Sequence, residues 1–314
     1  MRQIIYKRYG SFSDLEMVDQ PTPRPAHDQV LVNVEAVAIN PLDWKILEGQ
    51  MKLMTGSKFP RGIGIEFSGV VSQVGSSVTR FRKGDEVFGM LEAFKGGALA
   101  DQVLAKEAQM HTKPATLSFV QAAALPISGT SALQILDALA PVQAGTEVLI
   151  NGAAGGIGTL LTQMAKQRGA RVTAVVGRRG IDLATQLHSD FVVDYSSTNL
   201  VELNRQFDVV VDLSDKLPFA TAKSLMKPRS VYVNTLPDPK SMLASAVNNL
   251  LSQRKRKILM MKPSQEKLAT LSRYASEWMK VIVGKTAAME TYQTTYADVK
   301  AAGTLGKAVF SMEQ

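Results

Sequence analysis

The chain has 314 residues, and its 36 Lys and Arg against 28 Asp and Glu give a formal net charge of +8. At roughly 100 to 200 residues per domain, this length predicts one large domain or two ordinary ones. The absence of cysteine excludes disulfide scaffolds, thiolate zinc sites, iron–sulfur clusters and cysteine nucleophiles. Polar residues at the start argue against a secretory signal, and no apolar run approaches the roughly 18 residues that cross a bilayer. We therefore expect a cytoplasmic protein without integral membrane association.

The first part of the chain, from about residue 2 to residue 111, consists of short alternating apolar runs separated by Gly, Pro and Asp. Runs such as 29–37 and 66–71 predict antiparallel strands and turns. A short helix is expected at 42–48. This part is therefore predicted to form a mainly antiparallel β domain.

From about residue 118, short β-branched runs alternate with helical stretches. Such runs are typical of buried parallel strands, and they lie at 148–150, 172–176, 191–193, 207–211 and 231–233. The stretch 156–168 repeats apolar residues at the spacing of a helix that packs on a sheet. The alternation predicts a doubly wound α/β domain.

A glycine-rich turn joins the first of these strands to the helix at 156–168. Ala153, Gly155 and Gly158 stand where G-x-G-x-x-G has its glycines. In that motif the second glycine lets a pyrophosphate approach the backbone, the third lets helix and strand pack closely, and the helix N-terminus supplies N–H groups. Together with Gly156 and Ile157, these residues predict dinucleotide binding, with a purely structural turn as the alternative.

The loop after the next strand indicates which dinucleotide is bound. Gly177, Arg178 and Arg179 begin 19 residues past Gly158, where an NAD site usually has an acidic residue for the ribose hydroxyl. Guanidinium groups pair with phosphate instead, so we expect NADPH, with Arg178 as the first contact and Arg179 as the second. Tyr195 is a further candidate beside the same phosphate. Solvated loop arginines are the alternative.

Four consecutive cations, Arg254, Lys255, Arg256 and Lys257, form the tightest basic run. We interpret the run as a solvated helix end, where cations suit the negative end of the helix dipole, and not as a membrane-surface contact. Aromatic residues are only 6% and do not interleave with it, so nucleic acid is not expected as a partner. An edge strand at 257–262 would allow self-association, and a homodimer is predicted from it.

The tail predicts one long helix at 265–283 and a strand at 307–311. We expect the tail to return to the first domain. The predicted domains are therefore 1–117 with 263–314, and 118–262.

Taken together, these segments resemble the medium-chain dehydrogenase/reductase superfamily, in its zinc-free quinone oxidoreductase branch. The similar segments are AINPLD at 38–43, GIEFSGVV at 64–71, FRKGDEVFG at 81–89, GGALA at 96–100, AAALP at 122–126 and the turn at 153–158. DWKI at 43–46, the pair at 177–178 and ILMMKP at 258–263 are similar to chloroplast-envelope quinone oxidoreductase homologues and alkenal/enone reductases. The resemblance implies a discontinuous GroES-like domain plus a Rossmann domain.

The resemblance also implies that no catalytic metal is held. Zinc-dependent members use two Cys and one His, whereas this chain has Asn40 in place of the first Cys and Ile65 in place of the His. The three His residues lie far apart in the sequence, at 27, 111 and 188. We therefore predict hydride chemistry without a metal.

The remaining site residues are also implied by the resemblance. Lys45 is expected to contact cofactor and substrate and to stabilise an enolate oxygen. Asn40 is expected to donate to a carbonyl, and Asp43 to orient Lys45 or a backbone turn. The further cofactor contacts implied are Thr130, Asn234, Thr235, Leu236 and Lys307. No dedicated proton donor is evident.

The predicted activity is an NADPH-dependent transfer of hydride to the C=C bond of α,β-unsaturated aldehydes or ketones. Such acceptors are activated by their own conjugation, so they need only donors aimed at the developing oxygen charge. A quinone reductase is the alternative within the same chemistry. A non-catalytic NADPH-binding sensor is the alternative from another class. The expected partner is a small enal, enone or quinone.

Overall fold

The computed structural model describes residues 1–235, 239–261 and 263–312. The chain divides into two compact units, of which the first is Met1–Ile127 with Pro263–Gln314 and the second is Ser128–Lys262. The domain boundary that the sequence predicted, after residue 117, lies ten residues before the observed boundary after Ile127. The difference arises because helix α3 (Phe119–Ala123) packs on strands of the first unit.

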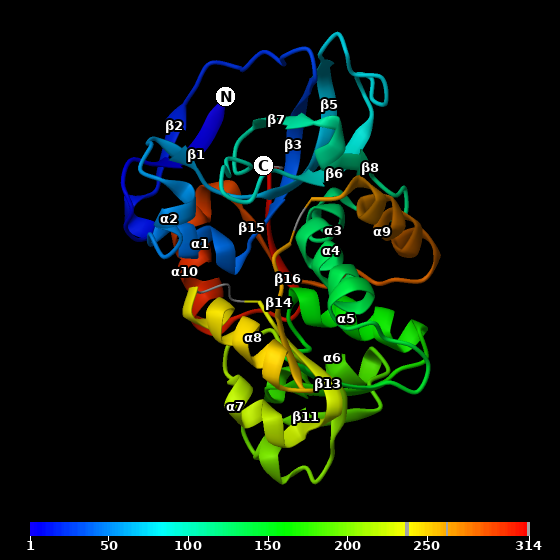
Figure 1. Ribbon diagram of the computed structural model, residues 1–314. Coiled ribbons are helices and arrows are strands. Elements are labelled where there is room, and N and C mark those ends of the chain that lie inside the picture. Colours follow the sequence, from blue (N-terminus) through cyan, green and yellow to red (C-terminus); the bar gives the residue numbers. More distant parts are fainter. Residues whose placement is uncertain (236–238, 262, 313–314) are drawn as a thin grey trace. The chain divides into compact units, whose positions relative to one another are not determined.

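The first unit is mainly antiparallel β-structure, as expected. Its larger sheet has the order β15-β16-β3-β5-β6-β8, with β7 paired to β3, and its smaller sheet has the order β2-β1-β4. The pair β15 and β16 is parallel, and the other pairs described in these two sheets are antiparallel. The strands are β1 (Arg2–Tyr6), β2 (Glu16–Asp19), β3 (Gln29–Ala38), β4 (Arg61–Gly62), β5 (Glu66–Val74), β6 (Glu86–Met90), β7 (Gln102–Lys106), β8 (Met110–Thr112), β15 (Val283–Ala288) and β16 (Lys307–Ser311) (Figure 1). Its helices besides α3 are α1 (Pro41–Leu47), α2 (Lys52–Thr55), α9 (Gln265–Glu277) and α10 (Tyr292–Ala302).

The core of the first unit joins segments that are far apart in the sequence. Phe67 of β5 and Phe310 of β16 are fully buried in one apolar cluster with Tyr296 of α10. Residues from β16 pair with 36–38 of β3. The tail therefore completes a sheet that the first hundred residues begin.

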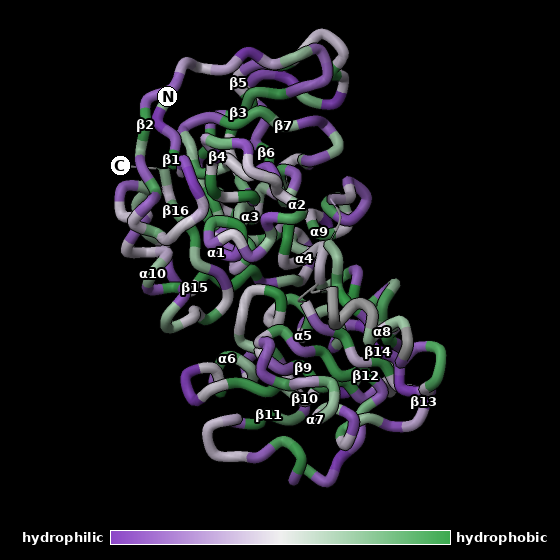
Figure 2. Tube along the Cα trace, turned by 60° about the vertical axis from the view of Figure 1, so that its left-hand side comes forward, coloured by the Kyte–Doolittle hydropathy of each residue, from purple (hydrophilic) through white to green (hydrophobic). Residues whose placement is uncertain are grey.

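The second unit is a doubly wound α/β domain, which confirms the expected fold class. Within the described residues its parallel sheet has the order β11-β10-β9-β12-β13-β14. The strands are β9 (Glu147–Asn151), β10 (Arg171–Val176), β11 (Phe191–Asp194), β12 (Phe207–Asp212), β13 (Met226–Asn234) and β14 (Lys255–Ile258), and the helices are α5 (Gly156–Gln167), α6 (Ile181–Gln186), α7 (Phe219–Ala222) and α8 (Pro239–Leu251). Helix α4 (Pro126–Gln134) begins in the first unit and continues into the second. The hydrophobic strands stand out as green stretches along β9 and β10 in Figure 2, where residues such as Val148, Leu149 and Ile150 are fully buried.

The basic run at 254–257 does not end a helix, so that expectation was wrong. Helix α8 ends at Leu251, and Lys255 begins β14, the outermost strand described in the parallel sheet. The cations are held by carbonyl oxygens: Arg254 Nε donates to Met226 at 3.0 Å, and Lys255 Nζ donates to Asn249 at 2.6 Å. Main-chain carbonyl oxygens therefore interact with these cations, whereas the negative end of a helix dipole was expected to do so.

Two predicted segments have different bounds in the structure. The edge strand expected at 257–262 lies earlier in the chain, as β14 at Lys255–Ile258. The pairing of this edge with a second copy stays a prediction. The helix expected to reach residue 283 ends at Glu277. Met279 and Val281 are buried while Lys280 between them is exposed, a period of two that suits extended chain. None of the helices described here is long and apolar enough to cross a membrane.

Candidate functional site

The glycine-rich turn of the second unit lies between β9 and α5, as the motif requires. Gly155 is the N-cap of α5, and its N–H donates to the Gly152 carbonyl at 3.1 Å. A Cβ placed on Gly158 would lie 2.3 Å from the Gly152 carbonyl oxygen and 2.6 Å from Ala153 Cα. Helix and turn are thus in backbone contact that only glycine permits at this position. The turn also brings Gly156 and Ile157 into the first turn of α5, whose unpaired N–H groups suit an anion.

The loop after β10 brings the predicted phosphate contacts together. Tyr195 N–H donates to the Val176 carbonyl at 3.0 Å, and a Cβ on Gly177 would lie 2.7 Å from the Tyr195 hydroxyl. Arg178 and Arg179 follow in an exposed turn. The tyrosine, the glycine and the two arginines therefore converge at the end of β10.

An acidic residue lies near the same loop. Hydrogen bonds from Ser196, and to a smaller extent the charge of Arg178, hold the pKa of Asp194 below its usual value. Asp194 is therefore an anion near Arg178, and any phosphate at this loop would be bound by the arginines in spite of that carboxylate.

Several buried polar atoms of the second unit have no hydrogen-bond partner in the described part of the chain, and two of them belong to residues expected to contact the cofactor. These two are Thr130 Oγ1 on α4, which is fully buried, and Asn234 Oδ1 at the end of β13. A buried group left unpaired costs roughly 1 to 3 kcal/mol, so each atom is suited to accept a partner from a ligand. Thr235 follows directly and is half-buried, and Leu236 lies outside the described residues. The glycine-rich turn from Ala153 to Gly158, here called the glycine cradle, has the backbone geometry that suits the pyrophosphate of a nicotinamide dinucleotide.

Sequence reasoning missed a polar network at the carboxyl ends of β9 and β12. Asn151 Nδ2 donates to Asp212 Oδ1 at 3.0 Å and to Ser214 Oγ at 2.8 Å, and Leu217 N–H donates to Asp212 Oδ2 at 3.1 Å. The sheet order reverses between these two strands, which is where ligands bind in open α/β sheets. A polar residue at the end of each apolar strand was the available signal.

In the first unit, Asn40 and Lys307 meet around a glutamate that the sequence did not single out. Glu66 is fully buried in β5; its Oε1 accepts from Asn40 Nδ2 at 2.9 Å and forms a close ion pair with Lys307 Nζ. Lys307 Nζ also donates to Asn40 Oδ1 at 2.7 Å. A charge inside an apolar run, as in EFSGVV, was the signal for it.

These contacts differ from the roles expected of Asn40 and Lys307. The amide of Asn40 donates to Glu66 and, at 3.3 Å, to the Ala38 carbonyl. Both amide hydrogens are therefore engaged inside the unit, whereas donation to a substrate carbonyl was expected. The Lys307 ammonium is likewise buried in the ion pair, whereas a cofactor contact was expected.

Asp43 acts on a backbone turn, which is one of its two expected roles. Its Oδ2 accepts from the Asn40 N–H at 2.8 Å and from the Tyr296 hydroxyl at 3.3 Å, so it fixes the start of α1. Burial raises the pKa of Asp43 to about 7, and the Asn40 hydrogen bond and the Lys307 charge oppose that rise. Asp43 Oδ1 has no hydrogen-bond partner in the described part of the chain.

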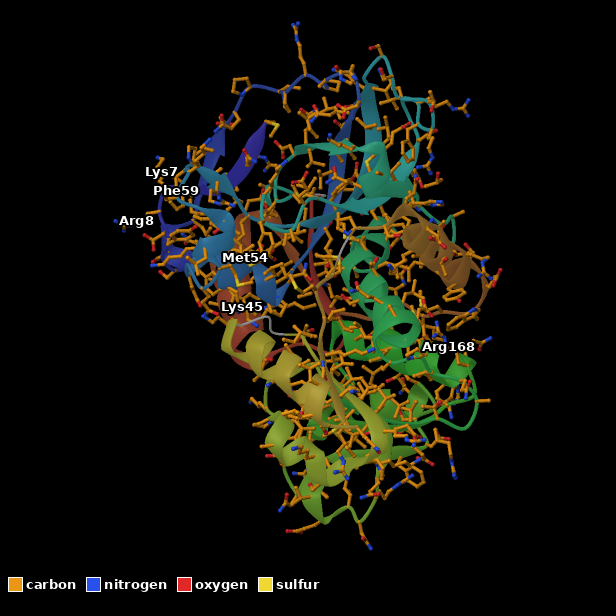
Figure 3. All side chains as sticks on the ribbon, in the orientation of Figure 1. Lys7, Arg8, Lys45, Met54, Phe59 and Arg168 are labelled. Atoms are coloured by element: carbon orange, nitrogen blue, oxygen red, sulfur yellow. The ribbon has the colours of Figure 1, made fainter. Side chains whose placement is uncertain are left out.

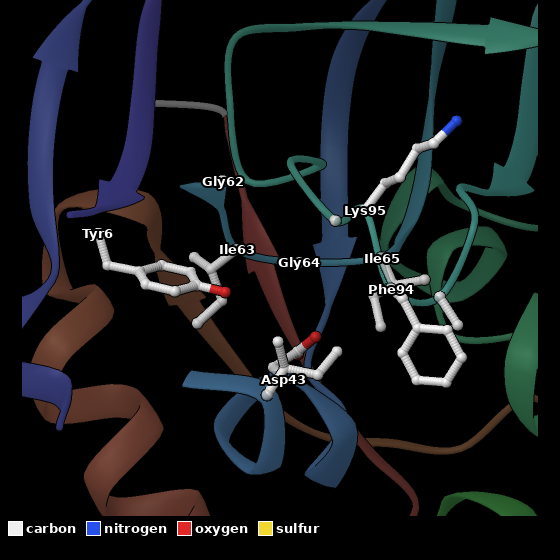
Figure 4. Close-up of a pocket in the computed structure, with 11 residues that line it drawn as sticks. Tyr6, Asp43, Gly62, Ile63, Gly64, Ile65, Phe94 and Lys95 are labelled. Carbon is white, nitrogen blue, oxygen red and sulfur yellow. The ribbon is translucent and has the colours of Figure 1, made fainter. Parts of the chain in front are cut away.

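A small pocket adjoins Asp43. Figure 4 shows Tyr6 and Asp43 beside the extended segment 62–65, with Phe94 farther along the wall. Its volume of about 10 Å³ is close to what one water molecule needs, so it is too small for an organic acceptor.

Lys45 lies on α1, two residues after Asp43, with a half-buried side chain (Figure 3). The neighbouring helix α2 exposes Leu53 and Met54. The first unit thus places a lysine and an apolar surface on consecutive short helices.

The residues of the first unit do not fit a zinc ion. Asn40 and Ile65, which the resemblance places where zinc-dependent members have two of their ligands, offer an amide bonded to Glu66 and an apolar side chain, and the ammonium of Lys307 lies against Asn40 and Glu66. Across the described ranges, no three His, Cys, Asp or Glu residues cluster as metal ligands would.

Comparison with known proteins identifies the family. Residues 26–115 match the alcohol dehydrogenase GroES-like domain, and residues 187–310 match the family described as zinc-binding dehydrogenase. A chloroplastic quinone-oxidoreductase homologue from Spinacia oleracea is 33% identical over 265 residues, which cover 81% of this chain and 80% of that protein. The chain belongs to the medium-chain dehydrogenase/reductase superfamily. It is a quinone oxidoreductase-like member of that superfamily, so the resemblance expected from the sequence is confirmed.

Other members of the superfamily agree in sequence and in fold. The NADPH-dependent alkenal/one oxidoreductase of Arabidopsis thaliana is 34% identical over 221 residues, covering 68% of this chain and 57% of that protein. The structure of the quinone oxidoreductase from Coxiella burnetii superimposes with a TM-score of 0.90 at 28% identity, covering 100% of this chain and 99% of that one. The expected combination of a GroES-like and a Rossmann domain is therefore confirmed.

Proposed function

We propose that the protein is an NADPH-dependent, metal-free reductase of the C=C bond of α,β-unsaturated aldehydes and ketones. The observation that carries the proposal is the convergence of Gly177, Arg178 and Tyr195 beside the glycine cradle. Two guanidinium groups at the end of β10 suit the extra phosphate of NADPH. The alkenal/one oxidoreductase of Arabidopsis thaliana, whose name includes this cofactor and this substrate class, supports it.

The turn, two polar side chains of the second unit and one lysine of the first unit have separate roles in the proposed reaction. The N–H groups of the first turn of α5, from Gly156 to Gly158, bind the pyrophosphate, and Thr130 and Asn234 offer their unpaired oxygens to the nicotinamide half. NADPH supplies the hydride when bound. The Lys45 ammonium stabilises the oxygen that becomes negative as the acceptor is reduced.

A quinone reductase is the second candidate, because relatives such as the Spinacia oleracea protein are named for quinones. The deciding assay follows NADPH oxidation with three acceptors: an alkenal, an aryl enone and a 1,4-quinone. Faster turnover of the enal and the enone supports the proposal, and turnover of the quinone alone supports the second candidate. NADPH binding without turnover of any acceptor would identify the non-catalytic sensor instead.

Arg178→Ala is expected to raise the KM for NADPH by about 10- to 100-fold and to leave the KM for NADH unchanged. A hydrogen bond to a charged group contributes roughly 1.5 to 3 kcal/mol, and each 1.4 kcal/mol is a factor of about ten. Steady-state kinetics with both cofactors measures the effect.

The matched control is Arg171→Ala, which removes an exposed arginine from the opposite end of the same strand, β10. The control is expected to leave both KM values unchanged. An equal rise of the KM for NADPH and for NADH in Arg178→Ala would show that the loop does not bind the extra phosphate of NADPH.

A further inference from the structure

Glu66 makes contacts with three separate elements of the first unit although its side chain is fully buried. Its Oε1 accepts from Asn40 Nδ2 at 2.9 Å and pairs with Lys307 at the start of β16. Its Oε2 accepts from the backbone N–H of Ile127 at 2.6 Å. Both oxygens of one carboxylate are therefore used, on opposite sides.

The contacted elements carry the candidate site residues. Asn40 is the N-cap of α1, the helix that bears Lys45. Ile127 lies in the first turn of α4, and Thr130, with its buried unpaired hydroxyl, follows three residues later on the same helix. One carboxylate thus orients the N-terminal ends of two helices.

The groups around Glu66 suit a negative charge that is fixed in one place. The first turn of α4 presents unpaired N–H groups and the positive end of the helix dipole. Lys307 balances the charge of Glu66 and, through Asn40 Oδ1, fixes which way the amide of Asn40 points. Apolar side chains of similar volume fill a core equally well, but they would fix neither the first turn of α4 nor the amide of Asn40.

We propose that Glu66 is a positioning residue that sets the affinity of the protein for both the nicotinamide cofactor and the acceptor. It acts through the ends of α4 and α1, and it touches neither ligand itself. The inference rests on the proposed function, because it assigns Thr130 to the cofactor and Lys45 to the acceptor.

The test is Glu66→Gln, which keeps the volume but turns one acceptor oxygen into a donor. In either amide orientation the new NH2 group faces an existing donor, the Ile127 N–H on one side or Asn40 and Lys307 on the other. The expected result is at least a tenfold rise both in the Kd for NADPH, measured by calorimetry without acceptor, and in the acceptor KM. The melting temperature is also expected to fall.

A second variant, Glu66→Gln with Lys307→Met, removes the buried ammonium that the first variant leaves unpaired. It is expected to recover melting temperature but to keep the weakened NADPH Kd. The matched control is Glu86→Gln, which breaks the ion pair of another buried lysine, Lys113, in the same unit. The control is expected to lower melting temperature without changing the Kd or the KM.

Three results would overturn the inference. They are an unchanged NADPH Kd in Glu66→Gln, recovery of Kd together with melting temperature in the double variant, and an equal rise of Kd in Glu86→Gln. A wild-type protein that binds NADPH but reduces no acceptor would refute the proposed function alone. The Kd for NADPH is measured without acceptor, so it would still show whether Glu66 affects cofactor binding. A wild-type protein that does not bind NADPH would refute both.

Discussion

Gly158→Ala is expected to abolish measurable NADPH binding and to lower the melting temperature of the protein. The added methyl group would lie 2.3 Å from the Gly152 carbonyl oxygen and 2.6 Å from Ala153 Cα, and both are backbone atoms that no side-chain rotation can move. Overpacking of this kind typically costs about 1 to 3 kcal/mol. The turn must open to relieve the clash, so the N–H groups that face the pyrophosphate separate. Calorimetric titration with NADPH and thermal unfolding measure the two effects.

Gly155→Ala is the matched control for this prediction. The nearest atom to its added methyl group is the Gly152 carbonyl oxygen at 3.5 Å, which is ordinary contact, and its φ of −84° suits alanine. We therefore expect an unchanged melting temperature with weakened NADPH binding, because the methyl group would stand where the pyrophosphate approaches. Normal binding in Gly158→Ala would show that the cradle tolerates a wider turn and that its close packing is not needed.

The second large effect is on the pH dependence of stability, through Asp43. Its pKa is raised by burial to about 7 in the folded protein, from an ordinary value of 3.8. The folded state therefore holds a proton that the unfolded state has released between about pH 4 and pH 7. Stability from this group is complete below about pH 4 and is lost as the pH rises to 7, at about 1.4 kcal/mol per pH unit.

Asp43→Asn tests this expectation, because an amide has the shape of the protonated acid and does not titrate. Its oxygen still accepts from the Asn40 N–H, and its NH2 group replaces the Oδ1 that has no partner in the described part of the chain. The free energy of unfolding is compared at pH 5, 6, 7 and 8. We expect wild type to lose stability relative to the variant up to about pH 7 and to remain parallel with it above. Parallel curves over the whole range would show that Asp43 is ionised in the folded protein.

Local patterns were enough to predict particular elements and the glycine-rich turn. The strand Lys307–Ser311 has the predicted bounds, and the turn from Ala153 to Gly158 lies between strand and helix as expected. These features depend on neighbouring residues, whose backbone requirements can be read directly from the chain. The structure therefore adds little to the sequence at those positions.

Long-range pairing was not predictable in the same way. Lys307 and Glu66 are 241 positions apart, and their ion pair depends on β16 entering the sheet beside β3. The basic run beginning at Arg254 was misassigned because propensity does not separate a helix end from an outer strand when cations dominate both. Tyr296 likewise reaches Asp43 only after α10 has packed.

The discontinuous sheet of the first unit also determines when folding can finish. The pairing of β16 with β3 requires residues 307–311, which leave the ribosome after the whole of the second unit. The second unit is continuous in the chain and pairs its strands through short crossovers, so it is expected to form first. Until β16 arrives, Glu66 lacks its counter-ion in an apolar interior. Pulsed hydrogen exchange during refolding should therefore protect β9 and β10 before β3 and β5, and the reverse order would contradict this expectation.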